Sequence, residues 1–443
     1  MLFSQSSIFK NQGSIIGTGM LSLLLLSACA VKSPDRLVKQ PQVERLIRTL
    51  SADDMQGRAT FSPGIEKAAS FIAGEFKEIG LKPLSGASNF RQEFSMTRIK
   101  PGVQQVSVNG NPLAASSIIS ITENPAINWS EASGIDLITI KAGESFFERY
   151  RAIMKADKSA LVLVDDSYAD AFKRIYEFNK RGKIVKELKG GSDIVFLLGV
   201  NQAASYSVKV NNIIEKLPLA NIAGMLPGKS KEKELVVFAG HYDHLGIIKG
   251  QADSIANGAD DDASGVTAVI SLAKYYKKLN NNERTLIFVA FTAEEIGGFG
   301  SHYFSEQLNP DDVVAMFNIE MIGKESKFGK NSAFITGYEK SDFGEILQRN
   351  LAGPQFTFHP DPYPQQNLFY RSDNATLAAL GVPAHTISTD QIDSDKLYHS
   401  VGDEFSTLDV NNITATIKAI ALSSRSIVSG KDSPKRIPRL AKQ

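Results

Sequence analysis

Short runs of consecutive apolar residues recur after about residue 217, and stretches with helical periodicity lie between them. Unbroken apolar runs of this length are typical of strands that are buried on both faces of a sheet. We expect strands at 235–239, 285–291, 313–321, 332–336 and 384–388, and a helix at 263–279. The alternation of strand and helix favours an α/β fold with a mostly parallel mixed sheet and helices on both faces.

The residues before this region indicate two helices. Apolar positions in 43–50 recur at helical spacing. The stretch 63–79 predicts a second helix, with Ser62 as its N-cap and Gly80 as its end. The polar residues 53–58 are expected to form a loop between the two helices.

The stretch 99–216 differs in character from both of its neighbours. It holds short strand-like segments, polar loops and one charged helical segment near 172–188, but no pattern of catalytic residues. We therefore predict an inserted β-rich domain at 99–216 that covers or narrows a site on the main domain. The main domain is expected to comprise 43–98 and 217–430.

The N-terminal residues have the pattern of an export signal. An apolar run at 20–26 is too short to span a bilayer permanently and has the proportions of a secretory signal. It ends in Leu-Ser-Ala-Cys, which resembles the lipobox of bacterial lipoproteins. The resemblance implies a signal peptide at 1–28, a lipid anchor on Cys29 and a polar tether at 29–42. An uncleaved signal anchor with an incidental cysteine is the alternative.

The predicted location follows from this anchor. We expect an exported protein held at the cell envelope by the lipid on Cys29. The outer membrane is favoured, because Ala30 stands where an inner-membrane retention signal usually has Asp.

Composition narrows the choice of partners. The formal net charge is +1 with well-mixed signs, so nothing favours nucleic acid as a partner. The single cysteine excludes an intramolecular disulfide and a thiolate metal cluster. Basic residues gather at 431–443, which we interpret as a frayed, solvated end.

Two polar clusters adjoin the first of these predicted strands and the helix at 263–279. Ligands in open α/β sheets bind outside the carboxyl ends of the strands, so such a position is itself evidence. His241 directly follows a strand, and Asp243 is a candidate partner for the second ring nitrogen of this histidine. Three consecutive aspartates, 260–262, precede the helix between glycines. A divalent cation would relieve their mutual repulsion, whereas an acidic N-cap would need only Asp262.

Further carboxylates and one histidine complete the set. Glu294 and Glu295 follow another buried strand, where one carboxylate can bind a metal while the other acts as a general base. Glu320 interrupts an apolar strand, so it is expected to be paired or metal-bound. Tyr398 and His399 lie in a polar loop after the last strand.

The remaining histidines are interpreted mainly as structural. His302 begins a helix, His359 lies among prolines and His385 falls in or near a strand. His244 fits either a structural role or a position lining a substrate site.

In this order, the clusters resemble the M28 family of zinc aminopeptidases. The resemblance covers 53–84 and 221–421. It implies the zinc aminopeptidase/phosphorylase-like fold, hydrolysis of N-terminal residues from peptides, and two zinc ions per chain. Some relatives carry a protease-associated domain at the place of 99–216.

The resemblance also implies a role for each matching residue. The implied zinc ligands are His241, Asp261, Glu295, Glu320 and His399, with Asp261 bridging both ions. Glu294 is the implied general base, and Tyr398 is the hydroxyl that polarises the substrate carbonyl. Asp243 supports His241, and Arg371 and Asp373 border the substrate site. Glu320 departs from the family pattern, which has Asp there; the charge is retained and the side chain is one methylene longer, so zinc is still expected to bind.

Two other functions share parts of this pattern. A glutaminyl cyclase-like zinc acyltransferase has the same fold and much of the same metal set. A non-catalytic, zinc-stabilised binding protein is the alternative from a different class. No Gly-x-Ser-x-Gly and no His-Glu-x-x-His occurs, so neither serine hydrolysis nor the zincin type of site is supported.

Overall fold

The computed structural model describes residues 33–250, 253–351, 353 and 355–440. The chain divides into two compact units, one formed by Phe94–Leu219 and the other by the residues on either side of that range. The predicted signal peptide and Cys29 lie outside the described residues, so the lipid anchor stays a prediction. Within the described ranges, no helix is long and apolar enough to cross a membrane.

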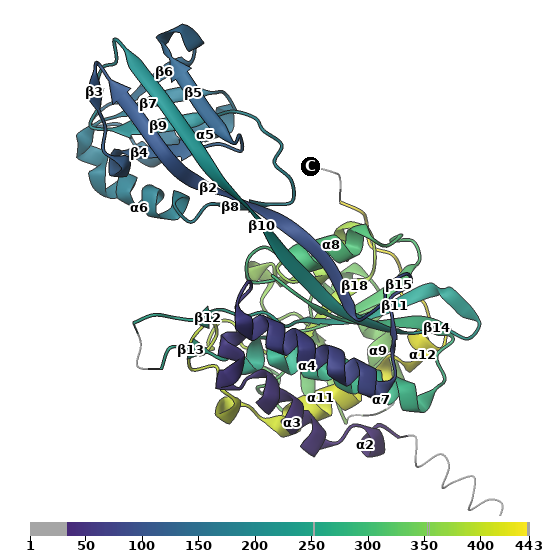
Figure 1. The fold of residues 1–443 in the computed structure, drawn as a ribbon. Helices are drawn as coiled ribbons and strands as arrows, with labels where there is room; N and C mark the ends of the chain where they lie inside the picture. Colours follow the sequence, from purple (N-terminus) through teal and green to yellow (C-terminus); the bar gives the residue numbers. More distant parts are fainter. Residues whose placement is uncertain (1–32, 251–252, 352, 354, 441–443) are drawn as a thin grey trace, which may run out of the picture. The chain divides into compact units, whose positions relative to one another are not determined.

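A mixed sheet forms the centre of the first unit (Figure 1). In spatial order its strands are β17 (Thr357–Pro360), β16 (Ser332–Ile335), β18 (Ala384–Ser388), β15 (Val313–Ile319), β11 (Lys231–His241), β14 (Arg284–Phe291) and β10 (Tyr206–Leu226). The four strands from β18 to β14 are parallel, whereas β16 and β10 run antiparallel to their neighbours β18 and β14. The two-residue strand β1 (Lys82–Pro83) pairs with β10. This sheet confirms the predicted fold class.

Helices cover both faces of this sheet. One face packs against α3 (Gln40–Leu50), α4 (Pro63–Ile79), α7 (Gly265–Leu279), α9 (Phe343–Leu351) and α11 (Val410–Ser423), and the other against α8 (Phe299–Glu306) and α10 (Asn374–Ala379). The short helices α2 (Pro34–Leu37) and α12 (Arg425–Val428) are the first and last helices among the described residues. Figure 1 shows α3, α4, α7 and α11 together below the sheet and α8 above it.

Alternation along β11 explains the two layers. Val236 and Phe238 belong to the core under the α7 face, whereas Val237 and Ala239 belong to the core on the α8 face. All four are fully buried, because successive side chains of a strand point to opposite faces.

The N-terminal elements agree with the sequence-based prediction at α4 but differ from it at 53–58 and at 34–42. Helix α4 spans Pro63–Ile79, with the Ser62 hydroxyl accepting a hydrogen bond from Ile65 N and Gly80 in the left-handed conformation. The segment Asp53–Arg58 forms 3₁₀ turns that are interrupted at Gln56 and Gly57, where φ is positive, so it is only partly the loop that was expected. The predicted tether is wrong for its described part, because α2 and α3 occupy most of 34–42 and Val38 is buried in the core.

The predicted frayed tail is also wrong for the described residues up to 440. Arg436 donates hydrogen bonds to the carbonyl oxygens of Val313 and Pro310. Ile437 is 4% exposed and packs in the core on the α8 face. The segment is therefore held against the unit by Ile437 and by the hydrogen bonds of Arg436, although its basic side chains stay exposed.

The second unit contains a continuation of the large sheet, a separate four-stranded sheet and two helices. In the continuation, parts of β10 and β2 (Arg91–Val108) pair with β3 (Asn111–Pro112), β5 (Ala126–Ser130) and β8 (Lys183–Val185). The four-stranded sheet has the order β4 (Ile118–Ile121), β9 (Ile194–Leu198), β7 (Ala160–Val164) and β6 (Asp136–Ile140). Helices α5 (Phe146–Ala156) and α6 (Ala169–Asn179) pack on the outer face of the four-stranded sheet.

The predicted insertion, 99–216, lies inside the bounds of this second unit. Its four-stranded sheet is parallel across β6, β7 and β9, with α5 connecting the first two. The description as β-rich therefore misses the α/β half of the unit. The expected helical segment near 172–188 begins earlier, as α6, and ends at Asn179 before β8.

Candidate metal centre

The carboxyl ends of the parallel strands bring the predicted site residues together. His241 is the last residue of β11, Glu294 and Glu295 follow β14, and His399 lies in the loop after β18. Glu320 directly follows β15, which ends at Ile319, two residues before the predicted end of that strand. Glu320 therefore does not interrupt a strand but occupies a strand end, like the other members of the site.

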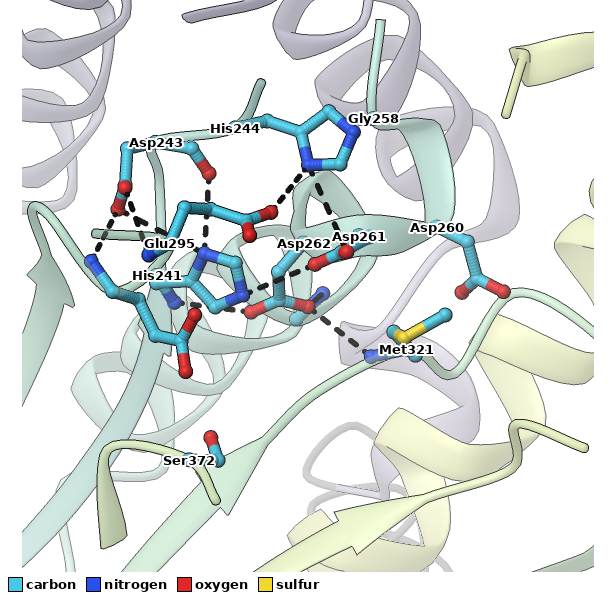
Figure 2. A network of polar contacts seen from close by, with 12 residues as sticks. His241, Asp243, His244, Gly258, Asp260, Asp261, Asp262, Glu295, Met321 and Ser372 are labelled. Carbon is cyan, nitrogen blue, oxygen red and sulfur yellow. Dashed lines mark hydrogen bonds and ion pairs between the residues drawn. The ribbon is translucent and has the colours of Figure 1, made fainter. Parts of the chain in front are cut away.

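Two groups of potential metal ligands share Asp261. His241, Asp261 and Glu320 form one group, and His244, Asp261 and Glu295 form the other; within each group the ligand atoms lie within 4.8 Å of one another. His241 Nε2 is 3.2 Å from Asp261 Oδ1. Figure 2 shows His241 and His244 on either side of the Asp261 carboxylate.

His399 approaches the second group from the opposite loop. Its Nε2 lies 3.1 Å from Glu295 Oε2 and 3.3 Å from Asp261 Oδ2. The ring of Tyr398 stacks on the His399 ring with the centroids 3.9 Å apart. The structure thus brings together every residue that the sequence assigned to metal binding.

Glycines permit the tight path of the loop before α7. Gly258 has a φ of 56°, and a Cβ there would come within 2.3 Å of the carbonyl oxygen of Asp261. A Cβ at Gly265 would lie 2.0 Å from the carbonyl oxygen of Ile319. No side chain fits at either position, so these glycines let Asp261 approach the strand ends.

Asp262 connects three elements at this edge of the sheet. Its carboxylate accepts hydrogen bonds from the backbone N–H groups of His241, Gly265 and Met321. These donors belong to the end of β11, the start of α7 and the segment after β15. Asp262 thereby fixes the relative positions of the backbone segments that carry the ligands (Figure 2).

Asp243 acts differently from the expectation. Its main-chain oxygen, not its carboxylate, lies within hydrogen-bond distance of His241 Nδ1, at 3.1 Å. Its carboxylate accepts hydrogen bonds from the backbone N–H groups of Glu294 and Glu295. Asp243 thus supports His241 through its backbone and orients the glutamate pair through its side chain.

A cavity of about 270 Å³ opens beside the ligands. Glu294, Arg371 and Tyr398 line it together with Glu320 and His399. Asp373 does not line the cavity; it is buried, and burial raises its pKa to about 7. Of the two residues predicted to border the substrate site, Arg371 therefore lines the cavity and Asp373 does not.

The part of the chain that carries the ligand groups is similar to a known protein family. Residues 221–423, which contain the ligand groups and Glu294, match the model of Peptidase family M28. The chain has an M28 peptidase domain.

Solved structures share the fold of the M28 domain. An aminopeptidase from Aneurinibacillus sp. strain AM-1 superposes with a TM-score of 0.52 at 18% identity, covering 93% of this chain and 98% of the other. A zinc aminopeptidase from Bacillus subtilis gives a TM-score of 0.51 at 15% identity, covering 89% and 97%. At these identities the likeness shows the fold alone.

Curated relatives match shorter segments. A probable zinc metalloprotease from Pyrenophora tritici-repentis is 26% identical over 155 residues, which cover 34% of this chain and 29% of that protein. A vacuolar membrane protease from Schizosaccharomyces pombe is 34% identical over 107 residues, or 24% of this chain and 12% of that protein. The matches thus span less than a third of these relatives.

The electrostatics of the M28 domain favour a bound cation. Burial raises the pKa of Glu294 well above its usual range, and the charges of Glu320 and Asp373 add to this. Burial opposes charge on His241, yet its contact with Asp261 and the nearby carboxylates hold its pKa well above the ordinary value. Hydrogen bonds to Asp261 and Glu295 raise the pKa of His399 to about 10. Carboxylates thus outnumber cationic groups here, and a bound divalent cation would offset the excess negative charge.

The donor set suits zinc. Imidazole nitrogens and carboxylate oxygens are ligands that Zn²⁺ prefers. His241 Nε2 is buried and has no hydrogen-bond partner among the described residues, although it faces Asp261. Such an unsatisfied nitrogen is expected at a position that binds a metal.

Sequence reasoning missed two supporting residues. Arg58 is fully buried and donates hydrogen bonds to the carbonyl oxygens of Leu50, Tyr242, Asn257 and Gly258. Asp403 accepts hydrogen bonds from the backbone N–H groups of residues 260 and 261. Neither residue follows a strand or belongs to a metal-binding motif. The one indication in the sequence was that Arg58 lies in 53–58, which is part of the resemblance to the M28 family.

Proposed function

We propose that this protein is a zinc-dependent aminopeptidase with two zinc positions. The observation that carries the proposal is the pair of ligand groups that share Asp261, with Glu294 lining the same cavity. One position would be held by His241, Asp261 and Glu320, and the other by Asp261, Glu295 and His399. The family match and the named activities of the structural relatives support this assignment.

The residues around the cavity divide the work of hydrolysis. Bound zinc supplies Lewis-acid polarisation of the substrate carbonyl and lowers the pKa of water. Glu294 accepts a proton from the attacking water and delivers it to the leaving amine. Burial raises the pKa of Glu294, which makes its carboxylate a stronger proton acceptor than an exposed glutamate. The Tyr398 hydroxyl donates a hydrogen bond to the oxyanion that forms at the carbonyl.

The charge of the cavity favours an N-terminal substrate group. Glu294, Glu320 and Asp390 line the cavity, and Arg371 is the one arginine or lysine in its lining within the described residues. A free α-amine is cationic and is attracted to such an acidic surface. An acetylated N-terminus has no such charge, so a blocked peptide is expected to be a poor substrate.

Replacing the proposed base tests the mechanism. We expect Glu294→Gln to retain zinc but to lower kcat on aminoacyl-nitroanilides by about 100-fold or more, because general base catalysis contributes about 10²–10⁴-fold. Mass spectrometry measures the zinc content, and steady-state kinetics measure the loss of kcat. Glu232→Gln, which changes an exposed glutamate on β11, is the matched control and is expected to behave like the wild type.

Substrate choice tests the reaction class in the same experiment. Free aminoacyl-nitroanilides should be hydrolysed and their acetylated forms should not. Near-normal turnover by Glu294→Gln would exclude Glu294 as the base. Cyclisation of an N-terminal glutaminyl peptide without hydrolysis of a leucyl substrate would replace the peptidase proposal by an acyltransferase.

A further inference from the structure

His244 is a third imidazole at the two shared carboxylates. Its Nδ1 lies 2.8 Å from Glu295 Oε1 and 3.7 Å from Asp261 Oδ2. Its side chain is fully buried, and it belongs to the same loop as His241. Figure 2 shows the ring of His244 directed at Glu295 and Asp261.

The backbone around His244 holds this ring in place. A Cβ at Gly258 would come within 2.5 Å of the His244 ring, so the loop before α7 packs directly against it. The backbone N–H of His244 donates to the carbonyl oxygen of Arg58, whose side chain binds the carbonyl oxygen of Gly258. Such packing on both sides preorganises a side chain for binding.

The two ligand groups are therefore unequal. His244 and His399 both face Asp261 and Glu295, whereas His241 alone faces Asp261 and Glu320. His399 is 38% exposed, but His244 is not exposed at all. The resemblance seen in the sequence assigned only His399 to this group.

Building on the proposed function, we propose that His244 is an additional ligand of the second zinc position. That position then has four protein donors, from His244, His399, Asp261 and Glu295, and the first has three. Four protein donors are typical of closed, tightly bound zinc, and three are typical of sites that keep a place for water or substrate. The second position should therefore retain its ion longest during chelation, and the first should lose its ion earlier.

Two variants at this position distinguish a ligand from an orienting group. His244→Ala removes the imidazole, and His244→Gln keeps an amide that can donate a hydrogen bond to Glu295. We expect both variants to lose affinity for the tightly held ion by more than ~100-fold, beyond the ~10–100-fold typical of losing a partner that only orients a ligand. His302→Gln, at an exposed position on α8, is the matched control.

Metal content and cobalt spectra are the measurements. Zinc retained by the full-length protein is counted during dialysis against increasing chelator concentrations, and Co²⁺ absorption bands report the ligands directly. The wild type should lose its ions in two steps, and the variants should lack the second step and show altered bands. Circular dichroism and thermal melting show whether each variant is folded.

Three results would overturn the assignment. Wild-type retention and unchanged cobalt bands in both folded variants would show that His244 is not a ligand. Recovery of wild-type metal affinity by His244→Gln, but not by His244→Ala, would make it a positioning residue for Glu295. A wild-type protein that binds no zinc would reject the proposed function itself, and that result is visible before any variant is compared.

Discussion

At the scale of single residues, His385 shows how burial keeps a histidine side chain neutral. Its Nδ1 lies 2.9 Å from the carbonyl oxygen of Thr336, and its Nε2 lies 2.8 Å from the Ser341 hydroxyl. The ring stacks on Phe343 with the centroids 4.8 Å apart. Burial lowers its pKa from 6.5 to about 4, because no carboxylate is bonded to this imidazole. His385 is therefore structural, in contrast to the three histidines at the ligand groups.

This lowered pKa predicts a dependence of stability on pH. Between pH 6.5 and about 4 the unfolded chain binds a proton at His385 that the folded chain does not, so stability falls as the pH falls. The full effect is about 3 kcal/mol below pH 4. Denaturant unfolding of the wild type and of His385→Gln across this range measures it. Equal slopes of stability against pH in the two proteins would contradict the prediction.

At the scale of elements, the C-terminal segment closes the α8 face of the core. Ile437 packs there with Leu377 of α10 and Val382 of the loop after α10. The backbone N–H of Leu440 donates to the carbonyl oxygen of Ala379. A segment rich in lysine and arginine thus contributes one apolar side chain to the core.

Ile437 and Leu440 form a matched pair for testing this. We expect Ile437→Ala to lower the free energy of unfolding by about 2–4 kcal/mol, as is usual for truncating a buried aliphatic residue. Leu440 is 53% exposed, so Leu440→Ala should change stability by less than ~0.5 kcal/mol. Denaturant titration measures both variants. A similar small effect at both positions would show that the segment is loosely held.

At the scale of the whole molecule, the chain leaves the first unit on β2 and returns to it on β10, and these strands are neighbours in the sheet. Ala223 N donates to Phe90 O at 2.8 Å, and Asn221 Nδ2 donates to Gln92 Oε1 at 2.9 Å. The chain ends at Glu93 and Ala220 therefore lie on neighbouring strands of the first unit. The ligand groups and the cavity beside them belong entirely to that unit.

The second unit should therefore be removable. We expect a chain in which an Asn-Gly turn replaces Phe94–Leu219 to fold and to bind zinc as the full-length protein does, because a two-residue turn joins adjacent antiparallel strands. Zinc content and thermal melting are the measurements. A folded but zinc-free product would show that the metal centre depends on the second unit. An insoluble product would show that the first unit needs the second unit in order to fold.

Much of the fold could be predicted because its causes are local. Helix α4 begins at Pro63 and ends at Ile79 as expected, since the Ser62 cap and the left-handed Gly80 act within one turn of the helix. The buried strands β11 and β14 follow from apolar runs that only an interior sheet can accommodate. The ligands were found for a related reason, because His241, Glu294 and Glu295 follow such strands directly.

The sequence by itself thus determined the fold class of the main domain and the residues with the chemistry to bind zinc. Only the tertiary structure decided which of them meet. Gly258, fourteen residues away along the chain, packs against His244, and Glu295 contacts it from the loop after β14. The tether and the tail looked solvated because their partners, such as Val313 for Arg436, are remote in sequence. Contacts of this kind depend on the positions of distant segments, which periodicity and spacing do not describe.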